Sequence, residues 1–368
     1  MKRSRVMHVV VGGDIGGAER LLVDLATRPL LTRADHEVAV FTPNRSLAQY
    51  FTGAGLRVHD RGFARESPVA YLRRSLGWSD VRWLSALLAE RGIDVVHTHT
   101  FGSHVLGTRA ATRVDRPQLR TEHHFVHYFD PSCRLFTRWA AERTDAIVAV
   151  SDFVRHTIVL AMPILGFRTT VARNGVDTAY WSPRDKAALG FRAGIVCRLT
   201  AWKRVHLAIR ASAIAGVDLV VVGSGEERGR LESLAQSLDA PVRFVGYEPD
   251  PRPLIAECDV MLNTSDREPL GLSVMEALAM GRPVIACSGG GIPEILKDGD
   301  TGLLVREASA EAFAHALRSV RDDPGRRATM GMRAREYAVA EGSIERTCEV
   351  YAREYDRLSR DPRSGALR

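Results

Sequence analysis

Residues 258–294 read CDVMLNTSDREPLGLSVMEALAMGRPVIACSGGGIPE, and their pattern indicates the fold class. Its apolar run at 260–262 predicts a buried strand. Ser273 is predicted to begin a helix that ends at Gly281, because glycine is favoured just past a helix end. Residues 283–286 predict the next strand. A strand, a helix and a second strand in this order indicate a parallel sheet with helices covering its faces.

Two carboxylates flank the start of this predicted helix, Glu268 before it and Glu276 within it. The backbone N–H groups of Gly271, Leu272 and Ser273 are expected to be unpaired there, and together with the helix dipole they form a phosphate site. A carboxylate beside such a site can accept hydrogen bonds from sugar hydroxyls. The alternative is a capping box, in which Glu276 only satisfies the backbone of Ser273.

Length and composition indicate an ordinary globular protein with two domains. The chain has 368 residues, of which 45% are hydrophobic and 26% are charged. No apolar run approaches the ~20 residues of a membrane-spanning helix, and the run at 6–11 is too short for a signal peptide. The five cysteines lie far apart without a C-x-x-C pair. They favour a reducing cytoplasm over a disulfide framework or a zinc site.

The net charge of +7 is confined to the first half of the chain. Residues 1–180 carry 24 Lys and Arg against 17 Asp and Glu, whereas residues 181–368 carry 27 of each. This imbalance suggests an anionic partner, either nucleic acid or an acidic membrane surface. The segment at 71–78 mixes arginine with aromatic and aliphatic residues, as an interfacial segment or a solvated loop would. No aromatic–basic pattern recurs, which argues against nucleic acid.

Short apolar strands alternate with amphipathic helices in both halves. Strands are predicted at 6–11, 38–41, 56–59, 94–98, 118–121, 146–150 and 169–172. The pattern restarts with strands at 194–198, 219–222, 242–245, 259–262, 283–286 and 302–305. We therefore predict an α/β protein with two doubly wound, Rossmann-like domains, 1–180 and 181–343, that face each other across a cleft. Ligands of such sheets bind beyond the carboxyl ends of the strands.

Cations and glycine turns follow several of these predicted strands. Arg198 ends one strand and Lys203 begins the next helix, a pair that suits a diphosphate, although two unrelated surface cations would look the same. Gly16 and Gly17 open the first helix, where a phosphate could approach the backbone closely. This loop is not a dinucleotide fingerprint, because Asp14 occupies the place of a required glycine. A tight turn explains the loop equally well.

Five histidines lie close together in the sequence and suggest a metal cluster: His97, His99, His123, His124 and His127. Because residues 94–98 predict a strand, we expect His97 and His99 to point to opposite faces. No helical H-x-x-x-H with a companion glutamate is present in the sequence. The D-G-D at 298–300 is attributed to turn chemistry. We therefore predict no metal site.

These residues together resemble the family-4 retaining glycosyltransferases of the GT-B fold, over nearly the whole chain. Residues 268–286 are similar to the family's two-glutamate donor motif, and residues 290–294 and 298–305 continue that pattern. Arg198 and Lys203 match the family's diphosphate pair. Residues 16–19 match its amino-terminal glycine loop, residues 174–177 match the segment before the hinge, and His123 matches its active-site histidine.

The resemblance implies a retaining transferase that needs neither a metal nor another cofactor. Glu276 would hold the ribose of a nucleotide sugar, and Glu268 the hydroxyls of the transferred sugar. The departing diphosphate would be stabilised by Arg198, Lys203 and backbone amides, as in an oxyanion hole. The implied catalytic residues are His123, Glu268, Arg198 and Lys203. The implied donor-binding residues are Gly16, Gly17, Arg198, Lys203, Gly223, Gly225, Gly246, Glu268, Gly271, Leu272, Ser273 and Glu276.

The resemblance also implies the partners of the two domains. The first would bind a lipid-linked, saccharide or natural-product acceptor and the second a nucleotide sugar, in polysaccharide or cell-envelope synthesis. The last helix, about 344–368, would pack back onto the first domain. The basic first half suggests a cytoplasmic, peripheral location at the inner face of the membrane. Alternatives are a phosphorylase or nucleotide-sugar epimerase of the same fold, or a catalytically silent sugar-binding protein.

Overall fold

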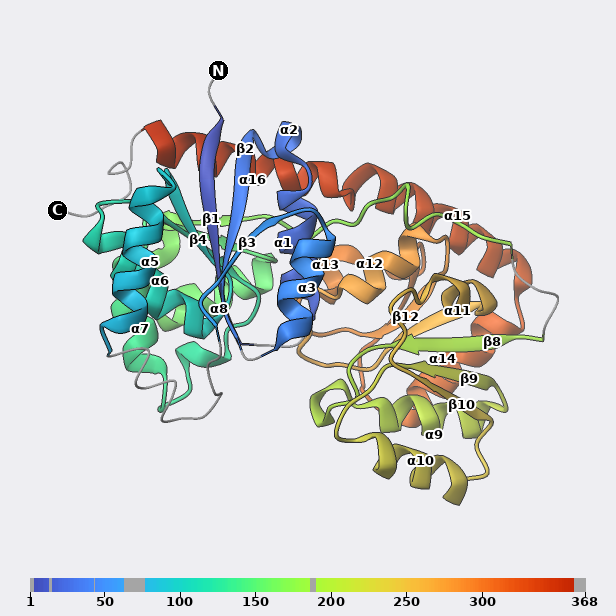
Figure 1. Cartoon of the computed structure of the whole chain (residues 1–368). Coiled ribbons are helices and arrows are strands. Elements are labelled where there is room, and N and C mark those ends of the chain that lie inside the picture. Colours follow the sequence, from blue (N-terminus) through green and yellow to red (C-terminus); the bar gives the residue numbers. More distant parts are fainter. Residues whose placement is uncertain (1–2, 13–14, 43, 63–76, 186–189, 361–368) are drawn as a thin grey trace. The chain divides into compact units, whose positions relative to one another are not determined.

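The computed structural model describes residues 3–12, 15–42, 44–62, 77–185 and 190–360 (Figure 1). The chain forms two compact units, one of residues 1–173 with 345–368 and the other of residues 174–344. The boundary therefore lies at Arg173 and Asn174, rather than at the predicted residue 180. Each unit is an α/β domain with a parallel sheet, as the sequence predicts.

The first unit contains a parallel sheet whose described strands are ordered β3-β2-β1-β4-β5-β6-β7. The strands are β1 (Ser4–Val11), β2 (Ala34–Phe41), β3 (Arg57–Asp60), β4 (Val95–Thr98), β5 (Gln118–Glu122), β6 (Ala146–Ala149) and β7 (Thr169–Val171). The order reverses between β1 and β4. In an open parallel sheet, such a reversal leaves a crevice beyond the carboxyl ends of the two strands.

Helices cover both faces of this sheet. They are α1 (Gly17–Ala26), α2 (Pro29–Thr32), α3 (Arg45–Gly53), α5 (Ser79–Glu90), α6 (Phe101–Arg113), α7 (Arg134–Glu142), α8 (Asp152–Ala161) and α16 (Ile344–Arg360), with 3₁₀ turns η1 (Val126–Tyr128) and η2 (Pro163–Arg168). Met7 and Val9 pack with α5 and α6 on one face. Val10 and Val38 pack with α1 and α3 on the other. This alternation follows from the period of two along a strand.

The C-terminal helix α16 packs on the first unit. The hydroxyl of Tyr355 lies 2.8 Å from Nδ1 of His97 on β4, and the hydroxyl of Tyr351 lies 2.8 Å from Oγ1 of Thr121 on β5. All four side chains are buried. Polar groups in a core are stable only when they are hydrogen-bonded, so these contacts fix the position of α16 along the sheet.

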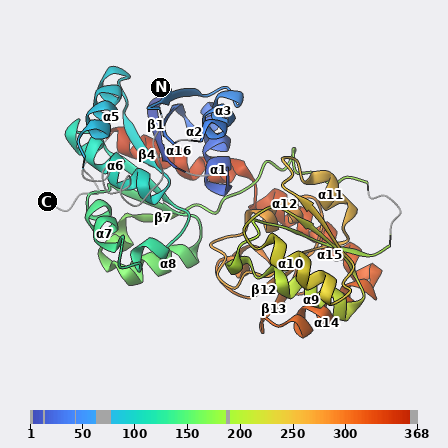
Figure 2. The same cartoon turned by 60° about the horizontal axis from the view of Figure 1, so that its bottom comes forward.

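The second unit has a parallel sheet of order β10-β9-β8-β11-β12-β13. Its strands are β8 (Arg192–Val196), β9 (Asp218–Val222), β10 (Val242–Gly246), β11 (Val260–Asn263), β12 (Val284–Cys287) and β13 (Gly302–Val305). Its helices are η3 (Ala201–Lys203), α9 (Val205–Ala215), α10 (Arg228–Ser237), α11 (Arg252–Glu257), α12 (Leu272–Ala279), α13 (Ile292–Ile295), α14 (Ala310–Arg321) and α15 (Pro324–Glu341). A core with α9, α10 and α14 covers one face, and α12 packs with α15 on the other (Figure 2).

Two sequence predictions concern a membrane: the lack of a spanning helix and an interfacial segment at 71–78. No helix in the described ranges is both long and apolar enough to span a bilayer. The predicted interfacial segment at 71–78 lies outside the described residues except for Gly77 and Trp78. The exposed ring of Trp78 lies 4.8 Å from the guanidinium of Arg109, and the choice between an interfacial segment and a solvated loop stays open.

Candidate active site

The predicted donor-binding residues of the second unit lie beyond the carboxyl ends of its strands. Arg198 follows β8, Gly223 follows β9, Gly246 ends β10, and Glu268 follows β11. Carboxyl ends of parallel strands meet at one edge of the sheet, where open α/β sheets bind their ligands. The sequence therefore brings these loops to one edge.

Glycines are required where these loops touch. The N–H of Gly223 donates to the carbonyl of Gly246 over 2.7 Å. A Cβ at Gly223 would lie 1.9 Å from the carbonyl oxygen of Cys197, and one at Gly225 would lie 2.3 Å from that of Leu199. Both glycines have positive φ. They allow the loop after β9 to pack directly on the loop that carries Arg198.

Helix α12 begins at Leu272, one residue earlier than predicted, with Gly271 as its N-cap at a φ of 99°. Ser273 is therefore inside the first turn, and the capping box considered for Ser273 and Glu276 is not formed at the N-cap. The first N–H groups of a helix have no acceptor within the helix. The N–H groups of Leu272 and Ser273 are the first two of α12. The N–H of the next residue, Val274, donates to the carbonyl of Gly271. Glu276 is buried within α12.

Lys203 and Glu268 form the central contact of this edge. Nζ of Lys203 lies 2.6 Å from Oε2 of Glu268, and their side chains are only 15% and 10% exposed. Nζ also lies 4.0 Å from the ring centroid of Trp202. Thr264, directly after β11, donates its hydroxyl hydrogen to the carbonyl of Lys203 over 2.7 Å. Sequence reasoning missed Trp202 and Thr264, which position Lys203 through contacts that no motif displays.

The glycine run after β12 contacts the backbone of Glu268 and fixes its position. The N–H of Gly291 donates to the carbonyl of Glu268 over 2.8 Å. A Cβ at Gly290 would lie 2.2 Å from the same carbonyl oxygen, and Gly290 has a φ of +65°. Only glycine fits this close backbone approach without strain. In contrast to this enclosed surrounding, Arg198 is exposed.

His123 follows β5 in the first unit. Its Nε2 is buried and has no hydrogen-bond partner among the described residues. Burial, with a smaller effect of the neighbouring His124, lowers the pKa of His123 to about 3. The imidazole is therefore neutral near pH 7 and can either donate or accept a hydrogen bond. A neutral, unpaired ring nitrogen of this kind suits contact with a sugar hydroxyl.

A buried ion pair holds the loop around His123. The guanidinium of Arg120 binds both carboxylate oxygens of Glu122, and the hydroxyl of Tyr128 donates to Glu122 over 2.7 Å. Nε2 of His127 lies 3.2 Å from the same carboxylate. Burial alone would raise the pKa of Glu122, but Arg120 and His127 hold it well below its usual range. The carboxylate is thus ionised and anchors η1 to β5.

Gly16 and Gly17 lie beyond the end of β1, beside the reversal in strand order. Gly16 is the N-cap of α1, and its N–H donates to Oε2 of Glu19 over 3.0 Å. Residues 13–14 of this loop lie outside the described residues. The contact of Gly16 with Glu19 is helix capping, so the donor-binding role of Gly16 and Gly17 stays a prediction.

Comparison with known proteins identifies the family. The model described as Glycosyltransferase Family 4 matches residues 15–180, and that described as Glycosyl transferases group 1 matches residues 191–337. D-inositol 3-phosphate glycosyltransferase from Kineococcus radiotolerans is 30% identical, over 93% of this chain and 91% of that protein. The chain belongs to glycosyltransferase family 4. Membership of this family favours a glycosyltransferase over a catalytically silent sugar-binding protein.

Other relatives of this glycosyltransferase act on varied molecules, as their names state. N-acetyl-alpha-D-glucosaminyl L-malate synthase from Bacillus anthracis is 29% identical, over 77% of this chain and 80% of that protein. The structure of Anabaena HepE in complex with UDP and glucose matches with a TM-score of 0.84 at 22% identity, over 96% of this chain and 100% of HepE. This likeness establishes the GT-B fold.

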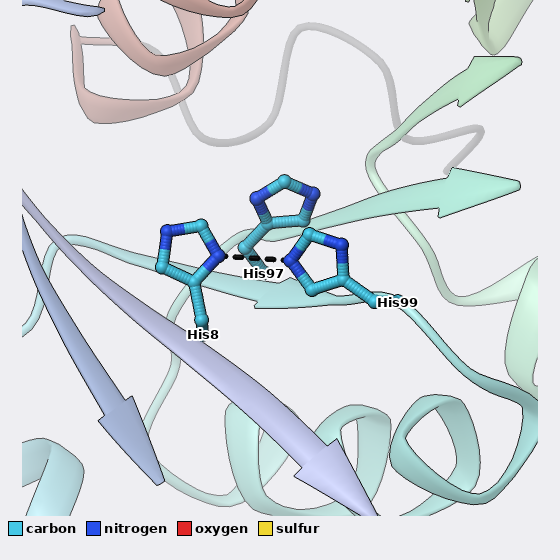
Figure 3. A group of neighbouring side chains, drawn as sticks. All are labelled: His8, His97 and His99. Atoms are coloured by element: carbon cyan, nitrogen blue, oxygen red, sulfur yellow. Dashed lines mark hydrogen bonds between the residues drawn. The ribbon is translucent and has the colours of Figure 1, made fainter. Parts of the chain in front are cut away.

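A cluster of buried histidines corrects one expectation about the glycosyltransferase (Figure 3). His97 and His99 do not point to opposite faces: their ring centroids are 4.0 Å apart. The expectation was wrong because residues two apart in a strand share a face. Nδ1 of His8 lies 2.8 Å from Nε2 of His99. One nitrogen from each of the three rings lies within 4.8 Å of the others, so the group could hold a metal ion.

Hydrogen bonds already engage most of the nitrogens in this cluster. His97 contacts Tyr355 and Thr121 through its two nitrogens, and His8 contacts His99 and His36. A metal would have to replace these bonds, and no carboxylate belongs to the group to offset its charge. The cluster therefore has a structural explanation, and the absence of a metal requirement stays a prediction.

Proposed function

We propose that this glycosyltransferase transfers a sugar from a nucleoside diphosphate sugar, with retention of configuration and without a metal, to a lipid-linked, saccharide or natural-product acceptor. The single observation that carries the proposal is the Lys203–Glu268 pair beside the start of α12. An ammonium group, a carboxylate and helix N–H groups together match a diphosphate linked to a sugar. The UDP and UDP-glucose complexes of HepE support a uridine nucleotide as the first donor to test.

Each group of the second unit has a role in this proposal. Lys203, the exposed Arg198 and the N–H groups at the start of α12 stabilise the negative charge of the leaving diphosphate. Glu268 accepts hydrogen bonds from the transferred sugar, and Glu276 from the ribose. In the absence of donor, Lys203 and Glu268 neutralise each other. Bound donor then supplies each with a new partner, phosphate for the ammonium and hydroxyl for the carboxylate.

The configuration of the anomeric carbon is retained because the acceptor oxygen attacks that carbon on the same face from which the diphosphate leaves. The bond between the anomeric carbon and the diphosphate oxygen breaks while a bond to the acceptor oxygen forms. The acceptor proton passes to the departing phosphate oxygen. Neutral His123 donates or accepts a hydrogen bond at a sugar hydroxyl and does not need to change charge. The basic first half of the chain supports work at the inner face of the membrane.

A panel of nucleoside diphosphate sugars tests the proposal by thermal shift, followed by assay of nucleotide release. A donor at 100 times its dissociation constant adds ~2.7 kcal/mol of stability, so the melting temperature should rise for one donor class. Glu276→Ala should abolish that shift and the release. EDTA should leave release unchanged. An intact wild-type protein with neither shift nor release across the panel would refute the proposal.

A further inference from the structure

Exposed apolar side chains follow the candidate catalytic histidine closely in the chain. Val126, Phe129 and Leu135 are 59%, 53% and 71% exposed. Scattered apolar residues on a surface need no explanation, but a group of large ones marks an interaction site. These three belong to η1, the turn after it and the first turn of α7.

Hydrogen bonds hold these turns together as one surface. The N–H of Phe129 donates to the carbonyl of Val126 over 3.0 Å, and that of Arg134 donates to the carbonyl of Asp130 over 2.8 Å. The hydroxyl of Thr137 on α7 donates to the carbonyl of His127 on η1 over 3.1 Å. The apolar side chains are therefore presented by a braced structure.

Unneutralised cations flank the apolar residues. Arg134 and Arg138 on α7 are exposed and form no ion pair with any residue in the described part of the chain. One acid lies in the same segment, Asp130, whose carboxylate accepts from the N–H and the hydroxyl of Ser132 over 2.8 and 2.7 Å. With two arginines against this one acid, residues 126–138 keep a net positive charge. Apolar side chains bordered by arginine match a bilayer with anionic headgroups.

We infer that Val126, Phe129, Arg134, Leu135 and Arg138 form a docking surface for an anionic lipid bilayer. The buried carboxylate of Glu122 binds Tyr128 of η1 and directly precedes His123. The docking surface and the candidate catalytic histidine thus belong to one braced segment. This segment brings a lipid-linked acceptor from the bilayer to the side of the enzyme that carries His123, an inference that rests on the proposed function.

Charge favours a bilayer over a second copy of the chain. A two-fold dimer places the same patch of each copy against itself. The two arginines of each copy would then face a surface that offers only one acid, Asp130, so like charges would outnumber opposite charges across the interface, which is unfavourable. An anionic bilayer instead neutralises the arginines while its acyl region receives the apolar side chains.

Vesicle co-sedimentation of the full-length protein tests the inference. Wild type should bind vesicles of phosphatidylglycerol and phosphatidylcholine, bind pure phosphatidylcholine weakly, and lose binding as salt rises. Arg134→Glu with Arg138→Glu should weaken binding by about tenfold or more, because each basic residue near an anionic surface adds about fivefold. Leu135→Glu should weaken it by roughly tenfold, through loss of one inserted leucine.

Matched controls sit on the second unit. Arg210→Glu reverses an exposed arginine of α9, and Met332→Glu replaces an exposed apolar residue of α15; both should bind vesicles like wild type. Equal binding by the surface variants and the controls would overturn the inference. So would a dimer in sedimentation velocity that Leu135→Glu dissociates without any vesicle binding.

Donor hydrolysis separates this inference from the proposed function. The surface variants should hydrolyse a nucleotide sugar at the wild-type rate and keep the donor-induced thermal shift, which also shows that they are folded. Vesicle binding without any donor hydrolysis in the wild type would refute the proposed function and leave the docking surface standing. Donor hydrolysis by a wild-type protein that binds no vesicles would refute the docking surface and leave the proposed function standing.

Discussion

Nζ of Lys203 lies 2.6 Å from Oε2 of Glu268, and this contact joins η3 to the loop after β11. Both side chains are largely shielded from water. A shielded charge that loses its partner is unfavourable, whereas the pair together is tolerated. The pair thus keeps two reactive groups ready at one place, and any ligand that separates them must supply a partner to each.

Loss of the ammonium group should slow the reaction strongly. Lys203→Gln is expected to lower the turnover of donor by about 10²-fold or more, as removal of one charge-stabilising donor does elsewhere. The measurement is the release of nucleoside diphosphate at saturating donor. Arg210→Gln, on the exposed side of α9, is the matched control and should retain wild-type turnover. A Lys203→Gln enzyme within threefold of wild type would remove Lys203 from the reaction.

Arg198 should act on the ligand and not on the fold. Its exposed side chain leaves little to lose on truncation, so Arg198→Ala should unfold at the wild-type temperature. Affinity for a nucleoside diphosphate should fall by roughly tenfold to a hundredfold, since a charge-assisted hydrogen bond contributes about 1.5–3 kcal/mol. Calorimetric titration with the nucleoside diphosphate and with the free nucleoside shows whether the loss of affinity comes from a contact with the phosphates. An equal loss for both ligands would contradict a phosphate contact.

Gly290 should tolerate no side chain. Gly290→Ala places a Cβ 2.2 Å from the carbonyl oxygen of Glu268 at a positive φ, so the loop must move and displace Glu268. We expect a loss of roughly 1–3 kcal/mol in unfolding free energy and loss of donor-induced stabilisation. Gly229→Ala in α10 is the control, because a Cβ there meets nothing within 4 Å. Chemical denaturation measures both variants.

The buried histidines should make the first unit sensitive to acid. Burial lowers the pKa of His36 to about 4 and holds those of His8, His97 and His99 well below 6.5. Between these values and the unfolded pKa of about 6.5, the unfolded chain binds more protons, so stability falls as the pH drops below about 6.5. Hydrogen exchange from pH 7 to pH 5 should show β1 and β4 losing protection before β8 and β11.

His36→Gln isolates part of this effect. The variant removes a group whose lowered pKa destabilises the protein by on the order of 1–2 kcal/mol at pH 5, so its unfolding free energy should depend less on pH than that of the wild type. Replacement of the exposed His156 by Gln serves as the control. Identical pH profiles for His36→Gln and the wild type would show that His36 does not contribute to the acid sensitivity in this range.

The sequence was informative where periodicity and turn chemistry act locally. Every predicted strand is present with ends shifted by at most four residues, the largest shift being at β2. Apolar runs bounded by glycine or proline specify buried parallel strands without help from the rest of the chain. The position of Glu268 beyond a strand end followed from the same pattern, whereas Arg198 was predicted to end its strand and lies two residues past β8. The ends of both strands were therefore predictable to within two residues.

What the sequence did not reveal depends on contacts between distant residues. Gly271 was predicted to contribute its N–H to a phosphate site, but its role as the N-cap of α12 at a positive φ was not predicted. Thr264 and Trp202 contact Lys203 only after the sheet has formed. The histidine cluster was misjudged through strand geometry and not through missing information, since His97 and His99 are two residues apart.

The return of α16 to the first unit determines the order in which a nascent chain can complete its cores. The strands that carry His97 and Thr121 emerge from the ribosome early, but Tyr351 and Tyr355 emerge after the whole second unit. Until then, two buried polar groups of the first sheet lack their final partners. The half of the enzyme that is translated first is therefore the half that matures last.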